Sequence, residues 1–582
     1  MKKLLNFIAL VALSALMLCS CSDPSNDIVE PLPEPQPKPE QPQPAVAPPD
    51  YLVMHYAQGG GDLDEGIIAN IMQVLDEGSN KKVKVTFEFK LSADLQALAE
   101  LKDFDGTRRL TADDNAHLKG QFKSLTSSYP AIPRTEISKC TSQLKSEKIG
   151  DANYEMTSSE ALADFIKWSK EKYPNAKHTI LIISDHGGAW DLVADGKQDT
   201  RAVVFDDNRN NESLSLQDIV DGANNGGGID MLYLDACLMS TYENLHGYAK
   251  CTKYLLASYE VAPGDGGDYR EFMKLLKEAG NDEKDLEPAM KAYVDYCISD
   301  NWWEGKSNYS HDIGFYDLSR LSEVTTVLKK VADTLAEKYV SDESIEPVGE
   351  VEDLLLTDKF APYIRESLTS CLVSYVFHTI SADSIPAIIA EFMAADGIVA
   401  EGSKYETLKV IKWIRDGKTE NAQLALEYYP NEWLDVEWQI ASLNYRSYSL
   451  TNLLLNLSNK LAFAEAQNNP FSQLHEDLLD ALRSIAYIKC TKNNFAEPFD
   501  TPYEVCSPGI LLVPFNDYYD GDLNTLRGSI PTYQEAMRYY QSTAFDQAVG
   551  WSRVLQLMDV FPDAFSNPMR ETYWEINPDD EE

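Results

Sequence analysis

LIISDHGGAWD (residues 181–191) and LYLDACLM (residues 232–239) are two short apolar runs that each end on a reactive side chain, His186 and Cys237. Short apolar runs bounded by turn signals are typical of strands that are buried on both faces, as strands of parallel sheets are. SLQDIVDGANN lies between the two runs and has helical spacing. Strand, helix and strand in this order predict a right-handed crossover that makes the two strands parallel neighbours.

The same alternation of strands and helices extends from about residue 51 to residue 340. YLVMHY (51–56) and KVKVTFEFK (82–90) are strand-like, and SSEALADFIKWSKEKYPN (158–175) is an amphipathic helix that opens with a capping serine. Alternating strands and helices predict the α/β class, with helices on both faces of a mostly parallel sheet. The polar stretch 191–213 is predicted to be irregular and exposed.

Beyond residue 340 the pattern changes. Residues 341–500 contain few strand-like runs and are predicted to be a mainly helical region. Residues 501–582 contain one strand-like run, SPGILLVPF, followed by helical patterns. This last part is predicted to complete the fold of the body formed by residues 51–340.

The N-terminus predicts export. Lys2 and Lys3 precede an apolar run from Leu4 to Leu18, which is typical of a signal peptide over residues 1–20. The run is too short to span a bilayer comfortably. The sequence around Cys21 (LCSC) resembles a bacterial lipobox, which implies cleavage before Cys21 and lipidation of its thiol. A soluble secreted protein cut near the same point is the alternative.

Residues 21–50 are rich in proline, which favours extended polyproline II and predicts a stalk. The expected location is therefore the cell envelope, with the protein anchored by lipid at the outer membrane or the cell surface. The formal net charge of −42 argues against nucleic acid as a partner and favours basic peptides. The seven cysteines after residue 21 form no CxxC pair and no zinc-like spacing, so no metal site is predicted.

The two strand ends carry groups suited to acyl transfer. A thiolate is strongly nucleophilic, and a neighbouring imidazole can stabilise it or protonate a leaving amine. Gly187 and Gly188 leave the main chain after His186 open, so an N–H there could bind an acyl oxyanion together with the N–H of Cys237. Asp235 lies two residues before Cys237 and so faces the same side of the strand. It could select a cationic substrate side chain, or it could cap the following helix.

Several segments resemble the clostripain-like cysteine peptidases, which belong to the caspase-like clan. The resemblance is carried by SDHGGAW (184–190), LYLDACLMSTYENLHGYAKCTKYLLASYE (232–260) and VAPGDGGDY (261–269). It implies a caspase-like α/β/α sandwich with a helical C-terminal addition. It also implies a catalytic dyad of Cys237 and His186, an oxyanion hole that uses Gly187, and Asp235 as the floor of a pocket for Arg or Lys.

The resemblance further implies a zymogen that is cut at a basic residue between the two motifs, where Lys197, Arg201 and Arg209 are candidates. No cofactor is expected. Calcium dependence occurs in the family, and Asp206 and Asp207 could serve as ligands, although no EF-hand spacing is present.

One departure from the family supports an alternative function. The family usually has Gly-Trp-x-Tyr where this chain has Gly266-Gly267-Asp268-Tyr269. The missing aromatic residue would remove one wall of the substrate cleft. Together with the large helical addition, this departure supports the alternative of a surface-binding lipoprotein on a catalytically weak peptidase scaffold.

Overall fold

The computed structural model describes residues 47–59, 63–92, 104–123, 134–192, 200–206, 209, 212–259, 262–264, 266–280, 282, 285–298, 311–340, 447–451, 454–455, 458, 470–490, 508–511 and 533–559. The signal peptide, the lipidation site Cys21, most of the stalk and residues 341–446 lie outside this set. The predictions made for them, and the predicted domain boundaries, stay predictions.

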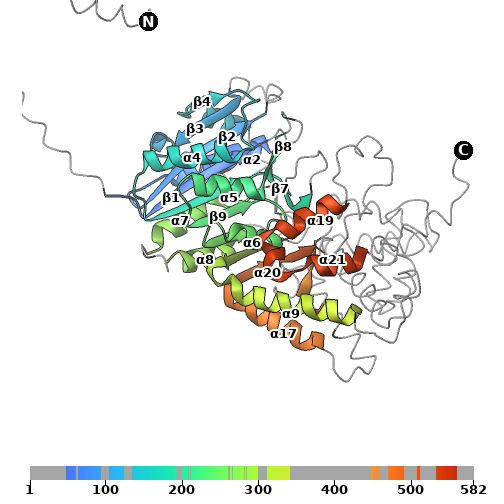
Figure 1. Ribbon diagram of the computed structural model, residues 1–582. Helices are drawn as coiled ribbons and strands as arrows, with labels where there is room; N and C mark the ends of the chain where they lie inside the picture. Colours follow the sequence, from blue (N-terminus) through green and yellow to red (C-terminus); the bar gives the residue numbers. More distant parts are fainter. Residues whose placement is uncertain are drawn as a thin grey trace, which may run out of the picture. The chain divides into compact units, whose positions relative to one another are not determined.

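A nine-stranded sheet with the order β13-β11-β10-β9-β5-β1-β2-β3-β4 forms the centre of the body (Figure 1). Its strands are β1 (Tyr51–Gln58), β2 (Val83–Leu91), β3 (Gly106–Thr111), β4 (Glu147–Gly150), β5 (His178–Ser184), β9 (Met231–Asp235), β10 (Tyr254–Ala257), β11 (Asp312–Asp317) and β13 (Ala486–Cys490). The five central strands, from β10 to β2, are parallel. The outer strands on both sides pair antiparallel. The predicted α/β class with a mostly parallel sheet is confirmed.

Successive residues of the central strands enter two separate cores. In β1, Leu52 and Met54 belong to one core, whereas Tyr51 and Val53 belong to the other. This alternation is the two-residue period of a strand that is covered on both faces. The continuous apolar runs seen in the sequence therefore reflect burial on both faces.

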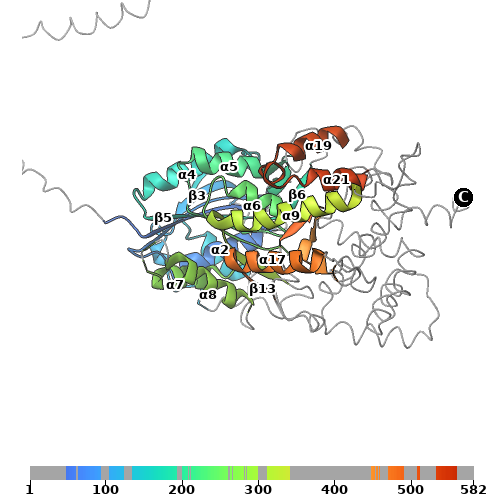
Figure 2. The same cartoon turned by 60° about the horizontal axis from the view of Figure 1, so that its bottom comes forward.

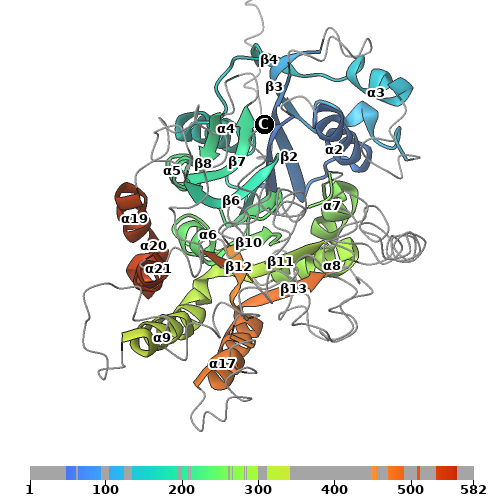
Figure 3. The ribbon, with the colours of Figure 1, turned by 90° about the vertical axis from the view of Figure 1, so that its right-hand side faces the viewer.

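Helices form a layer on each side of the sheet (Figure 2, Figure 3). The helices that contribute to the Tyr51 core are α2 (Asp64–Glu77), α3 (Arg134–Thr141), α7 (Tyr269–Glu278) and α8 (Leu286–Ile298). The helices that contribute to the Leu52 core are α4 (Ser159–Lys172), α5 (Leu216–Asn225), α6 (Tyr242–Tyr248), α9 (Leu321–Val340), α17 (Pro470–Ile485), α19 (Tyr533–Ser542), α20 (Ala544–Val549) and α21 (Ser552–Asp559). The sandwich implied by the resemblance is thus present.

Two capping serines explain where the helices beside β5 and β9 begin. Ser158 accepts a hydrogen bond from the N–H of Ala161 and starts α4, as the sequence predicts. Ser215 and Asp218 form a capping box at the start of α5, the crossover helix between β5 and β9. Each cap thus fixes the start of the helix that leads into one of the two strands, α4 into β5 and α5 into β9.

The C-terminal part of the chain contributes to the same body. β13 is the edge strand beside β11, although it comes from the region predicted to be mainly helical. α17 packs on α9, and α20 packs on both α6 and α9. β12 (Ser447–Ser449) pairs with β14 (Gly509–Leu511). Within the described ranges, no helix combines the length and apolar character needed to cross a membrane.

Candidate active site

The register of β5 and β9 brings the two predicted catalytic residues to one edge of the sheet. The strands are parallel neighbours, and Ser184 is paired with Asp235. His186 and Cys237 each follow these paired residues by two positions. Both therefore leave the carboxyl ends of adjacent strands, the edge where open α/β sheets bind ligands. The predicted pairing of the two strands is confirmed.

Cys237 is partly exposed, and its surroundings favour the neutral thiol. Its Sγ lies 3.7 Å from the carbonyl oxygen of Ala262. Burial raises the pKa of the Cys237 thiol to about 11, and the negative charge of Asp235 acts in the same direction. Backbone groups of Ala262, Cys237 and Gly187 act against this rise in pKa. At neutral pH the thiol is protonated, so a base must remove its proton when it attacks.

Gly187 lies against the main chain of Cys237. A Cβ atom on Gly187 would be 2.0 Å from the carbonyl oxygen of Cys237 and 2.8 Å from its nitrogen. Only glycine fits at such a distance. The backbone groups predicted to form an oxyanion hole are thus neighbours in space.

The residue after Cys237 has a strained backbone. Leu238 has a φ of 68°, in the left-handed region that a leucine rarely adopts. Such a conformation costs roughly 1–2 kcal/mol and persists only where the surrounding structure enforces it. The buried side chain of Leu238 provides part of that support. The strained turn sets the direction in which the chain leaves the strand end at Cys237.

Asp235 is a buried carboxylate held by neutral donors. Its Oδ2 accepts hydrogen bonds from the hydroxyl of Tyr269 at 2.5 Å and from the N–H of Gly267 at 3.1 Å. Burial raises the pKa of Asp235, and these hydrogen bonds oppose the rise. The following helix, α6, is capped by Thr241. Of the two roles considered for Asp235, helix capping is therefore excluded.

Gly266 and Gly267 allow the loop before α7 to approach Asp235. Gly266 has a φ of 64°, and a Cβ there would lie 2.6 Å from Oδ2 of Asp235. A Cβ on Gly267 would lie 2.1 Å from the hydroxyl oxygen of Tyr293 and 2.5 Å from that of Tyr233. Both tyrosines are buried. A side chain at position 267 would therefore point into the protein core, so its absence removes no cleft wall in this backbone.

The described residues of the stretch 191–213, which are 191–192, 200–206, 209 and 212–213, lie mostly in strands, which corrects the sequence prediction for them. β6 (Gly187–Leu192), β7 (Thr200–Asp206) and β8 (Glu212–Ser215) form a three-stranded antiparallel sheet (Figure 3). Val203 and Val204 are fully buried. The polar composition of the stretch is misleading because its few apolar residues, Val203 and Val204 among them, pack into the core of the main body.

Asp206, one of the two acids considered as a calcium ligand, forms a buried ion pair instead. Nζ of Lys90, at the end of β2, lies 2.5 Å from Oδ2 of Asp206, and both side chains are 0% exposed. Lys90 also donates to the carbonyl oxygen of Tyr154 at 2.9 Å. The pair anchors β7 to the main sheet through Oδ2 of Asp206. Asp207 lies outside the described residues.

The three candidate processing residues differ in their surroundings. Lys197 lies outside the described residues, between the ends of β6 and β7. Arg201 lies within β7 and is paired with Asp191 on one side and Ser215 on the other. Arg209 forms a salt bridge with Glu212 at 2.8 Å. A protease needs an extended, accessible segment, so the positions of Arg201 and Arg209 are poor sites for a first cut.

Three residues near Asp235 were not identified from the sequence. His55, Ser184 and Tyr269 form a row of hydrogen bonds that ends at the carboxylate. Ser184 carried one usable signal, since it ends β5 two residues before His186. Tyr269 carried another, since it is the tyrosine of the motif over residues 266–269. His55 lies on β1 and carried none.

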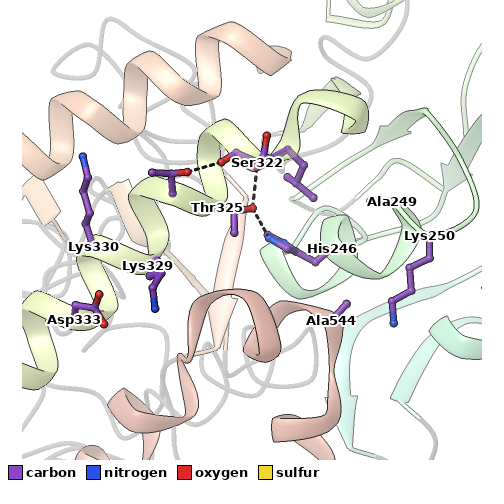
Figure 4. Close-up of a pocket in the computed structure, with 11 residues that line it drawn as sticks. His246, Ala249, Lys250, Ser322, Thr325, Lys329, Lys330, Asp333 and Ala544 are labelled. Atoms are coloured by element: carbon purple, nitrogen blue, oxygen red, sulfur yellow. Dashed lines mark hydrogen bonds between the residues drawn. The ribbon is translucent and has the colours of Figure 1, made fainter.

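A pocket of about 650 Å³ lies away from the strand ends, between α6, α9 and the start of α20 (Figure 4). It is lined by His246, Ala249, Lys250, Leu321, Ser322, Thr325, Thr326, Lys329, Lys330, Asp333 and Ala544. His246 is buried and is hydrogen-bonded to Thr325 and to the carbonyl of Tyr242, which fits a structural role. None of the residues that line this pocket is a predicted site residue.

Comparison with known proteins gives one family. The family model described as the clostripain family, Peptidase_C11, matches residues 132–469, more than half of the chain. Clostripain from Hathewaya histolytica is 25% identical over 327 residues, which cover 50% of this chain and 57% of that protein. The chain thus matches little more than half the length of this curated relative.

Two solved structures are also similar. One is a secreted C11 cysteine protease from Bacteroides thetaiotaomicron, "iotapain", at 15% identity and a TM-score of 0.33, covering 50% of this chain and 71% of that chain. The other is an inactive zymogen C11 protease from Parabacteroides distasonis, at 11% identity and a TM-score of 0.41, covering 86% of this chain and 99% of that chain.

Proposed function

Because this chain belongs to the clostripain family of peptidases, we propose that it is a cysteine endopeptidase with a dyad of Cys237 and His186. The observation that supports this most directly is the register of β5 and β9, which places the two residues at the same strand-end edge. The family match covers both motifs.

In the proposed reaction, Cys237 attacks the carbonyl carbon of the substrate as His186 takes its proton. The raised pKa of the thiol means that this transfer accompanies attack, because little thiolate is present beforehand. The imidazolium then protonates the leaving amine, and water releases the acyl group. The backbone N–H groups of Gly187 and Cys237 are suited to bind the oxyanion, which agrees with their close approach.

We further propose that the substrate residue before the cut is Arg or Lys and that Asp235 binds its side chain. A buried carboxylate whose partners are neutral keeps its negative charge available for an incoming cation. It lies at the end of β9, two residues from the nucleophile. The proposed partners are accordingly peptides or proteins with basic residues.

Activation is proposed to require a cut between the two motifs. Lys197 is favoured over the other two candidates, because Arg201 is paired within β7 and the side chain of Arg209 is bound to Glu212. No cofactor is proposed, since the thiol and the imidazole supply both nucleophile and acid–base chemistry. Addition of EDTA is expected to leave turnover unchanged.

Export and lipid anchoring at Cys21 are proposed from the signal-like N-terminus alone. The mass of the N-terminal peptide of protein purified from membranes would test the anchor. A peptide that begins at an unmodified residue would contradict it.

The alternative, a surface-binding lipoprotein on a weak peptidase scaffold, relied on the missing aromatic residue at position 267 and on the large helical addition, of which residues 341–446 lie outside the described residues. The hydroxyls of Tyr233 and Tyr293 occupy the space where a side chain at that position would lie. This departure therefore no longer favours the alternative.

The proposal is tested with residues 22–582 expressed as wild type, Cys237→Ala and Cys490→Ala, each treated with trypsin to cut between the motifs and then cleared of trypsin on immobilised soybean trypsin inhibitor. Cys490 is a matched control because it is also a partly exposed free cysteine, on β13. Peptides with Arg or Lys before the cut should be hydrolysed by the wild type and by Cys490→Ala only. Equal hydrolysis by Cys237→Ala would disprove the dyad, and turnover after neutral residues would disprove the specificity.

A further inference from the structure

We propose that a row of three buried residues, the positioning row, orients the Asp235 carboxylate for the basic side chain of the substrate. The row consists of Tyr269, Ser184 and His55. The inference rests on the proposed function and assigns residues that determine specificity without touching the substrate.

The row is continuous and buried. The hydroxyl of Tyr269 lies 2.5 Å from Oδ2 of Asp235, and it lies 2.9 Å from Oγ of Ser184. Oγ of Ser184 lies 2.7 Å from Nε2 of His55. All four side chains are less than 9% exposed. Each distance is within the range of a hydrogen bond between these atoms.

The chemistry of these groups fixes the direction of every proton. Ionised Asp235 can only accept, so Tyr269 donates to it. Tyr269 has one proton, so its oxygen accepts from the hydroxyl of Ser184. Ser184 has then also used its proton, and its oxygen accepts from Nε2–H of His55. Burial lowers the pKa of His55 to about 3, so the imidazole is neutral and carries one proton, on Nε2.

All donors in the row therefore point toward Asp235. Its Oδ2 receives both the Tyr269 hydroxyl and the N–H of Gly267, which use the two lone pairs of that oxygen. The hydroxyl of Tyr233 is a further neutral group that acts on this carboxylate and opposes the rise of its pKa. In the proposal, Oδ1 receives the guanidinium or ammonium group of the substrate. Because every donor is neutral, the row fixes the orientation of the carboxylate without cancelling its charge.

The row also connects elements that are far apart in the sequence. His55 belongs to β1, Ser184 to β5 and Tyr269 to the first turn of α7. The N–H of Tyr269 is bound to the side chain of Gln73 on α2, and its ring lies 4.8 Å from the ring of His55, centroid to centroid. These contacts hold the tyrosine hydroxyl against the carboxylate. Small displacements of a charged group are costly to recognition.

A purely structural role is the competing explanation, and a selectivity ratio separates the two. Residues 22–582, cut with trypsin and then cleared of it on immobilised soybean trypsin inhibitor, would be assayed with two fluorogenic peptides that differ only in having Arg or citrulline before the cut. Citrulline has the shape of Arg without its charge. Tyr269→Phe should lower the Arg-to-citrulline ratio of kcat/KM about tenfold, because a hydrogen bond to a charged group is lost. Ser184→Ala should lower this ratio less than Tyr269→Phe does. Ser184→Thr keeps the hydroxyl and should have the wild-type ratio.

Tyr56→Phe is the matched control. Tyr56 follows His55 on β1, is equally buried, and donates its hydroxyl to the carbonyl of Met156 at 2.8 Å on the other face of the sheet. It should leave the ratio unchanged. A ratio unchanged in Tyr269→Phe, or lowered as much in Tyr56→Phe, would overturn the positioning row.

Benzamidine binding, followed by calorimetry, distinguishes failure of the row from failure of the proposed function. This probe carries the amidinium charge of an arginine side chain and needs the pocket but not the thiol. Weaker binding to Tyr269→Phe than to wild type would support the row even if no peptide is cleaved, in which case only the peptidase proposal fails. Absence of binding to the cut wild type would overturn the positioning row and the proposed pocket at Asp235, whereas cleavage of peptides by the same protein would still support the dyad.

Discussion

Asp235 and Asp206 are both fully or almost fully buried carboxylates, yet they are stabilised in opposite ways. Asp206 lies 2.5 Å from the ammonium group of Lys90, so its charge is matched by a cation. Asp235 is held by a tyrosine hydroxyl and a backbone N–H, so its charge is not matched. The comparison shows that the partners of a buried carboxylate indicate its role better than burial does. A matched charge anchors a strand, and an unmatched charge remains available to a ligand.

The largest effect is expected where the matched pair is broken. Asp206→Ala leaves Lys90 buried without its counter-ion and should lower the free energy of unfolding by about 3–5 kcal/mol. Urea titration followed by circular dichroism would measure this loss.

Two further variants sharpen the comparison. Lys90→Met combined with Asp206→Leu removes both charges and should recover most of the stability. Asp113→Ala breaks the more exposed pair with Lys84 and should cost less than about 1 kcal/mol. Equal losses for Asp206→Ala and Asp113→Ala would show that burial of the Lys90 pair has no energetic consequence.

A smaller effect, confined to activity, is expected where the unmatched charge is removed. Asp235→Asn should lower kcat/KM for Arg substrates by about tenfold to a hundredfold, the value of a hydrogen bond to a charged group. Turnover of a citrulline substrate should change little.

Asp235→Asn should raise the free energy of unfolding, whereas Asp206→Ala should lower it. Burial raises the pKa of Asp235 above its ordinary value, so keeping it ionised at neutral pH costs folding free energy. The neutral amide removes that cost. A loss of stability in Asp235→Asn as large as in Asp206→Ala would contradict the distinction between the two carboxylates.

The smallest effect concerns the thiol. The pKa of Cys237 is raised to about 11, first by burial and also by the charge of Asp235. Iodoacetamide labelling of the free protein should therefore accelerate steadily from pH 7 towards pH 10, since the thiolate fraction keeps rising below the pKa. At a given pH, labelling should be faster in Asp235→Asn than in wild type. A plateau above pH 7 would indicate a preformed thiolate and contradict the raised pKa.

The local sequence pattern was sufficient to predict the strands, but it did not predict which side chains the buried polar groups contact. β5 and β9 were predicted because runs such as TILIIS are apolar along their whole length, and the strand ends then placed His186 and Cys237. The described residues of the stretch 191–213 were predicted wrongly because buried groups among them, such as the Asp206 carboxylate, contact residues far away in the sequence. Lys90 and Asp206 are 116 positions apart, and His55 and Ser184 are 129 apart. No local periodicity reports such contacts.

The order of strands in the main sheet has a consequence for a protein cut between Leu192 and Thr200. All strands before the cut, β5-β1-β2-β3-β4, lie on one side of the β5–β9 boundary, and all strands after it, β9-β10-β11-β13, lie on the other. The cut would turn one polypeptide into two complementary fragments, with His186 on one and Cys237 on the other. Recovery of such a molecule from denaturant would be bimolecular, with a rate that depends on protein concentration, whereas the uncut chain would refold independently of it.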